Sequence, residues 1–276
     1  MLDDARLREL AQRLVAVPGV VGVALGGSRA RGDHAPDSDV DLGLYYRPPL
    51  DVAGLRVLAR HVTGGDVEVT EPGAWGPWVD GGAWLNIEGT AVDWLYRDLD
   101  RVQASWNDAR AGRFEFHFQV GHPLGVPDFA YAGELALGVA LADPTAELAA
   151  LQREMAVYPP ALRTALIERL WEAGFSLDNA RKAVSRADTT YVAGCLFRVM
   201  ELCAHAVHAH SGRWLVNEKG AIASAGHLAA APEDFSRRAH QAMAHLGDDP
   251  TQLQAAVTAA SELLDDVRAA CDDSRP

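Results

Sequence analysis

The chain has 276 residues, of which 49% are apolar and 23% charged, as in a globular protein long enough for one large or two ordinary domains. Its formal net charge is −13, and neither half has the excess of Lys and Arg that nucleic-acid-binding proteins use to attract phosphates. This charge favours cations and cationic small molecules as partners and argues against DNA or RNA.

The N-terminal residues carry no pattern of basic residues followed by an apolar segment, as a signal peptide would. We also find no uninterrupted apolar run near the about 18 residues that a membrane helix needs. We therefore expect a cytoplasmic protein that does not associate with a membrane.

The first half of the chain alternates helical and strand patterns. Leucines at 7, 10 and 14 have helical spacing, and Pro18-Gly19 follows them, which predicts a first helix over residues 3–16. The other expected elements are, in order, a strand at 20–25, a polar loop at 28–38, a strand at 39–46, a helix at 51–63, strands at 66–70, 83–88 and 91–96, and a strand or extended linker at 114–120.

Beyond about residue 130 the strand signals stop, and Ala, Leu, Arg and Glu dominate. We therefore predict an α+β domain over residues 1–140 and an all-helical bundle over residues 141–276. The expected helices cover 131–142, 145–156, 160–172, 176–187, 189–211, 233–246 and 250–271.

Two carboxylates, Asp39 and Asp41, are separated by one residue in a predicted strand. Strand side chains alternate between faces, so both would point the same way, about 7 Å apart. Such a pair can hold two Mg²⁺ ions about 3.5–4 Å apart, an arrangement that suits phosphoryl or nucleotidyl transfer. A similar pair, Asp66 and Glu68, lacks the loop described next, and we interpret it as a solvated strand face.

The loop before this strand begins Gly26-Gly27-Ser28-Arg29-Ala30-Arg31-Gly32. Gly27 allows the backbone to approach a triphosphate closely, and the hydroxyl of Ser28 can donate to a phosphate oxygen. Arg31 can offer a fork of donors to the β or γ phosphate. The loop is not a Walker A motif, because no Gly-Lys-Ser/Thr follows.

Gly27-Ser28 followed by Asp39-Val40-Asp41 resembles the signature of the DNA polymerase β-like nucleotidyltransferase superfamily, in the form found in its minimal and antibiotic-modifying branches. The resemblance covers residues 26–44 closely and the remainder loosely. It implies a small mixed sheet with flanking helices, two Mg²⁺ ions and an NTP as co-substrate.

The resemblance also implies a third carboxylate on a later strand, which completes the metal site and often acts as general base. We assign this role to Asp93, because a carboxylate within the apolar strand 91–96 is costly unless metal or hydrogen bonds compensate. Glu88, just before the turn at Gly89-Thr90, is the competing candidate.

Two further features are left with two interpretations each. Lys219 could reach the triphosphate from the helical half, or could be a surface lysine. Trp75, Trp78 and Trp84 could form a wall for the acceptor or the base, or could pack as core and loop residues.

The sequence thus predicts an enzyme that transfers a nucleoside monophosphate, AMP by preference, from an NTP to a hydroxyl of a small acceptor such as an aminoglycoside. The acidic charge and the second helical domain support a small-molecule acceptor. A nucleotidyltransferase acting on a protein or tRNA, as in toxin–antitoxin systems, and a non-catalytic nucleotide-binding scaffold are the alternatives.

Overall fold

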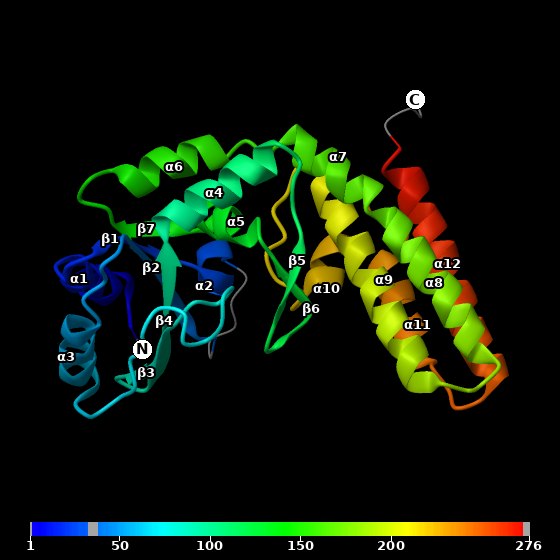
Figure 1. Cartoon of the computed structure of the whole chain (residues 1–276), viewed down its shortest axis with the longest axis horizontal. Helices are drawn as coiled ribbons and strands as arrows, with labels where there is room; N and C mark the ends of the chain where they lie inside the picture. The colour runs from blue at the N-terminus through cyan, green and yellow to red at the C-terminus, as the bar shows by residue number, and fades with distance from the viewer. Residues whose placement is uncertain (1, 33–37, 273–276) are drawn as a thin grey trace. The chain divides into compact units, whose positions relative to one another are not determined.

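The computed structural model describes residues 2–32 and 38–272, which form two compact units. The first comprises Met1–Asp108 and Glu115–Val157, and the second Ala109–Phe114 and Tyr158–Pro276. The first unit is built on a sheet with helices, and the second is helical (Figure 1). The first unit thus extends to Val157, whereas the domain boundary expected from the sequence lies at residue 140.

A five-stranded mixed sheet is the centre of the first unit, with the order β3-β4-β2-β1-β7. The central pair, β2 and β4, is parallel, and the other neighbours are antiparallel. The hairpin between β3 and β4 turns at Glu88 and Gly89, whose φ angles of 52° and 82° suit a tight two-residue turn. The strands are β1 (Val20–Leu25), β2 (Val40–Tyr46), β3 (Gly82–Ile87), β4 (Thr90–Asp98) and β7 (Val139–Ala142).

Helices α1 (Asp4–Val15) and α3 (Val52–Thr63) cover one face of this sheet with apolar residues. They share a buried core with every second residue of β2 and β4, because strand side chains alternate between faces. The strand residues in this core are Val40, Leu42, Leu44, Val92, Trp94 and Tyr96. The residues between them, which include Asp41 and Asp93, therefore face the other side of the sheet.

Helix α4 (Leu99–Arg110) follows β4 directly and was not predicted. The side chain of Asp98 accepts hydrogen bonds from the backbone N–H groups of Asp100, at 2.8 Å, and Arg101, at 3.4 Å, as a capping residue does at a helix start. The sequence contained this signal, since Leu99, Val102 and Trp106 have helical spacing and are buried.

The predicted helix over 131–142 is wrong at its end. Helix α5 (Ala130–Leu137) stops at Gly138, which is extended with φ −73° and ψ 159°, and β7 begins at once. β7 pairs with β1, and α6 (Glu147–Met155) packs Leu148 where a Cβ on Gly22 of β1 would lie. These contacts explain why residues beyond 140 belong to the first unit.

The predicted strand at 66–70 is also wrong. Val69 is buried and the backbone N–H of Thr70 donates to the carbonyl of Gly82 at 2.9 Å, but the segment forms no ladder. Asp66 forms an ion pair with Arg60 of α3 at 2.6 Å, so it lies on the helix side. The segment at 114–120, left open by the sequence, contains strand β5 (Phe116–Gln119), which pairs with β6 (His122–Pro127) as a separate hairpin.

The second unit consists of helices packed around α9 (Thr189–His210). By length and apolar composition α9 could cross a membrane, but 72% of its apolar stretch is buried, as in the core helix of a bundle. The short helix α10 was not predicted. Helices were predicted over residues 160–172 and 176–187, but the boundary between the two observed helices lies at Arg169. The helices around α9 are α7 (Pro160–Glu168), α8 (Leu170–Val184), α10 (Ala221–Gly226), α11 (Phe235–Ala244) and α12 (Pro250–Ala270).

Candidate nucleotidyl-transfer site

The glycine–serine segment forms a short helix, α2 (Gly27–Arg31), directly after β1, where the sequence predicted a loop. Residues 33–37 of that predicted loop lie outside the described residues. The backbone N–H of Gly26 donates to the carbonyl oxygen of Asp41 at 2.8 Å, so the turn is attached to the neighbouring strand. Gly27 begins the helix with a φ of 61°, in the left-handed region where glycine is favoured.

Gly27 and Asp41 lie in direct contact. A Cβ built on Gly27 would lie 1.8 Å from Oδ2 of Asp41, so no larger residue fits without moving the carboxylate. This contact places the N-terminal end of α2, which includes Ser28, beside the first strand carboxylate. The segment predicted to bind the triphosphate therefore lies next to Asp41.

Asp41 and Asp93 are register partners in the parallel pair of β2 and β4. Partners in register on neighbouring strands point to the same face, and side chains on one face of a sheet interact across the strands. Asp39 lies just before the first residue of β2 and is exposed. Two of the three predicted carboxylates, Asp41 and Asp93, thus lie on adjacent strands, and Asp39 lies two residues before Asp41, outside the strand in which the sequence placed it.

Burial and neighbouring carboxylates raise the pKa of Asp93 and of Asp41. Partial burial, followed by the negative charges of Asp41 and Asp39, raises the pKa of Asp93 to about 6. The pKa of Asp41 is also raised, first by burial and then by the charges of Glu134 and Asp39. Such mutual repulsion is what a bound divalent cation relieves, and carboxylate oxygens are ligands that Mg²⁺ prefers.

Two arginines of α2 act on this region in different ways. The charge of Arg31 lowers the pKa of Asp41, so its guanidinium lies near enough to act on this carboxylate, and its role at the phosphates stays a prediction. Arg29, which sequence reasoning did not assign, donates through Nε and Nη2 to the carbonyl oxygen of Ser38, at 3.1 and 2.7 Å, and through Nε to that of Asp39. Arg29 therefore positions the chain that enters β2.

Arg97 and Glu134 form an ion pair that the sequence analysis did not identify. Arg97 lies four residues after Asp93, on the same face of β4, and is 6% exposed. Its guanidinium pairs with the carboxylate of Glu134 on α5. The two charges have opposite effects on the pKa of Asp41, so the pair lies close to the carboxylates and partly balances itself. Because side chains alternate along a strand, extending the predicted strand by one residue would have placed Arg97 on the same face as Asp93.

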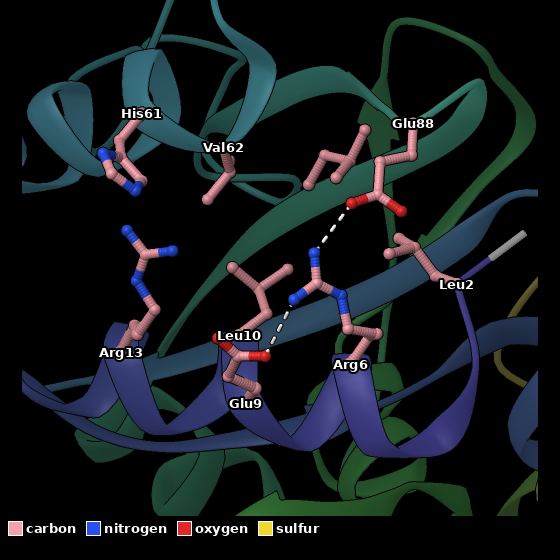
Figure 2. A pocket seen from close by; sticks show the side chains of 9 residues that line it. Leu2, Arg6, Glu9, Leu10, Arg13, His61, Val62 and Glu88 are labelled. Carbon is pink, nitrogen blue, oxygen red and sulfur yellow. Dashed lines mark hydrogen bonds and ion pairs between the residues drawn. The ribbon is translucent and has the colours of Figure 1, made fainter.

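Glu88, the competing third carboxylate, is held elsewhere. Its carboxylate accepts from Arg6 of α1 at 2.7 Å, beside the pair formed by Arg6 and Glu9. Figure 2 shows these side chains around a pocket that also contains Arg13 and His61, which face each other across it. The pocket is lined by α1 and α3, which cover the sheet face opposite Asp41 and Asp93.

Lys219 lies in the second unit, exposed, just before α10. Its backbone N–H donates to the side-chain oxygen of Asn217 at 2.8 Å. Its suggested reach to the triphosphate stays a prediction.

The donor set fits a divalent metal. In the part of the chain that the structure describes, no three Asp, Glu, His or Cys side chains form a ready-made metal-binding group. Asp41 and Asp93 are nevertheless adjacent, half-buried and mutually repelling, and Asp39 is close enough to raise the pKa of both. These three residues are the ones that would hold Mg²⁺.

The fold and the site define a class of protein. A glycine–serine segment after the first strand, followed by carboxylates on two adjacent parallel strands, has the chemistry that a metal-bound triphosphate requires. Residues 6–70 match a protein-family model described as "Nucleotidyltransferase domain". Within the first unit, residues 6–70 are therefore similar to a nucleotidyltransferase domain, the domain of the DNA polymerase β-like superfamily.

Among solved structures, a nucleotidyltransferase-like protein from Exiguobacterium sibiricum is similar, with 13% sequence identity and a TM-score of 0.45. The match covers 95% of this chain and 74% of that one. No curated protein matches the sequence.

The raised pKa of Asp93 predicts how stability depends on pH. Because the folded pKa, about 6, lies above the value of the unfolded chain, about 3.8, ionised Asp93 opposes folding. This penalty is absent below the unfolded pKa and complete above the folded one. In urea titrations with a metal chelator, the wild-type protein should therefore lose stability relative to Asp93→Asn as the pH rises from 4 to about 7. A constant difference between the two proteins would contradict the assigned pKa.

Proposed function

We propose that the protein transfers a nucleoside monophosphate, AMP by preference, from an NTP to a hydroxyl of a small acceptor such as an aminoglycoside, in a Mg²⁺-dependent reaction. The observation that carries the proposal is the parallel register of Asp41 with Asp93 beside the Gly27–Ser28 turn. The net charge of −13 supports a cationic small acceptor over a nucleic acid.

In this mechanism the end of α2, with Ser28 and Arg31, binds the triphosphate. Asp39, Asp41 and Asp93 would hold Mg²⁺, and the metal would supply positive charge to offset that of the phosphates and of the leaving pyrophosphate. Asp93 accepts the proton of the acceptor hydroxyl. The acceptor oxygen then forms a bond to the α-phosphorus as the bond to pyrophosphate breaks.

Two measurements test the proposal. The first is the thermal stabilisation of the protein by ATP, GTP, CTP and UTP, each with and without Mg²⁺, and we expect stabilisation only when both are present. The second is transfer of label from α-labelled NTP to panels of aminoglycosides, tRNA and proteins.

We expect label on a small hydroxylated molecule. Label on tRNA or protein instead would support the alternative of a macromolecular acceptor. Nucleotide binding without transfer to any panel would support a scaffold, and absence of Mg²⁺-dependent binding would exclude the proposed reaction.

A further inference from the structure

An exposed tryptophan lies directly beside Asp93. Trp84 of β3 is the register partner of Asp93 in the antiparallel pair of β3 and β4, so both side chains lie on the same face of the sheet. The side chains of Ala83 and Leu85, on either side of Trp84, are buried in the core on the opposite face. Trp84 itself is 66% exposed, which core packing does not explain.

The ring of Trp84 is held in place by a second tryptophan. Trp75 stacks on it with ring centroids 4.4 Å apart and an angle of 11° between the planes. We name these two residues the indole pair. A large, flat and exposed surface of this kind is suited to stacking against a ring and to attracting a cation over its face.

The segment that carries Trp75 is fixed by buried polar contacts. Gln119 of the β5–β6 hairpin, 5% exposed, donates from Nε2 to the carbonyl of Trp75 at 2.7 Å. The carbonyl of Asp80 accepts from the N–H of Trp75 at 3.1 Å, and the Asp80 carboxylate accepts from Tyr46 and from the N–H of Gly73, at 3.0 and 2.8 Å. These bonds attach Trp75 both to the sheet and to the hairpin, so the position of the indole pair is fixed by the fold.

The strand order determines on which side of the proposed nucleotide site the indole pair lies. Across the sheet, the site face presents α2 after β1, then Asp41 on β2, Asp93 on β4 and Trp84 on β3. In-line transfer requires the leaving pyrophosphate and the attacking oxygen on opposite sides of the α-phosphorus. With the triphosphate on the α2 side, the acceptor approaches from the β4 and β3 side, where Trp84 lies.

We infer that Trp84, supported by Trp75, is the acceptor subsite, and that it stacks against a ring of a cyclic alcohol whose hydroxyl faces Asp93. The inference rests on the proposed nucleotidyl transfer and names its acceptor class. Trp84 is a specificity-determining residue in this arrangement, and its indole does not contact the triphosphate. Loss of one stacking surface should weaken acceptor binding roughly tenfold.

Steady-state kinetics with the acceptor identified by the transfer panels provide the first test. Trp84→Ala should raise KM for the acceptor about tenfold and leave KM for the NTP within about twofold, and Trp84→Phe should recover most of the loss. The matched control is Trp171→Ala, because Trp171 is 62% exposed on α8 of the second unit. A rise in KM for the NTP alone, or an unchanged KM for the acceptor, would overturn the inference.

A binding measurement tests the subsite without turnover. In protein labelled with 5-fluorotryptophan, Trp84→Phe identifies the ¹⁹F signal of Trp84. We expect 2-deoxystreptamine, glucosamine or myo-inositol, added to protein saturated with Mg²⁺ and α,β-methylene-ATP, to shift that signal. A Trp84 signal that responds to the nucleotide analogue alone, or to no cyclic alcohol, would overturn the inference. Absence of any Mg²⁺-dependent nucleotide binding would instead identify a failure of the proposed function.

Discussion

Replacing Asp41 by asparagine is expected to abolish nucleotidyl transfer while leaving the fold intact. Asparagine keeps the shape of the side chain but removes the charge that would bind Mg²⁺, and metal ions contribute several kcal/mol to such reactions, so kcat should fall by about 10³-fold or more. Burial and neighbouring carboxylates raise the pKa of Asp41, so loss of its charge relieves repulsion instead of breaking a favourable pair. Asp39→Asn and Asp93→Asn should behave similarly.

Glu88→Gln is the matched control for these variants. It also neutralises one carboxylate, but Glu88 pairs with Arg6 and lies by the pocket on the other side of the sheet. Transfer should be measured with α-labelled NTP, and folding by circular dichroism and melting temperature. Full activity of Asp41→Asn, or a loss in Glu88→Gln as large as that in Asp93→Asn, would contradict the assignment of the site.

Replacing Gly27 by alanine is expected to reduce transfer by about 10²-fold or more. The Cβ of the alanine would lie 1.8 Å from Oδ2 of Asp41, much closer than van der Waals contact. Either the carboxylate or the end of α2 must therefore move. A displacement of about 1 Å near reacting groups can cost this much in rate.

Gly32→Ala separates this contact from backbone strain. Gly32 also has a positive φ, 76°, but a Cβ there would have no atom within 4 Å among the described residues. Both variants should lose about 1–2 kcal/mol of stability in urea unfolding from the left-handed conformation. Gly27→Ala should lose more, and it alone should lose activity. Equal activities of the two variants would show that the contact between Gly27 and Asp41 has no role in transfer.

The local pattern of the sequence was sufficient for most elements. The pattern of apolar residues predicted α1, β1, β2, α3 and the β3–β4 hairpin, because each is an apolar or amphipathic segment that ends at Gly, Pro or a tight turn. It failed where a boundary lacks such residues or where pairing decides the state. Residues 139–142 form a strand because β1 offers them a partner, and residues 66–70 form none although Val67 and Val69 alternate with polar residues.

The site was predictable in part for the same reason. The contact of Gly27 with Asp41 joins segments close in sequence, and the motif indicates it. The register of Asp41 with Asp93 and of Asp93 with Trp84 depends on which strands become neighbours, and one sequence does not specify this. Arg97 and Glu134 were missed because their residue types are common and only the fold brings them together.

The strand order places the proposed nucleotide-binding and acceptor-binding residues on separate parts of the chain. In the proposed reaction, residues that bind the nucleotide come from α2 and β2, whereas the indole pair comes from β3 and the segment before it, with Asp93 on β4 between them. Substitutions in β3 and residues 71–81 can therefore change the molecule that is modified without altering the turn at Gly27. This separation makes the β3 side the natural place to redesign, or to diversify, selectivity on a constant chemical step.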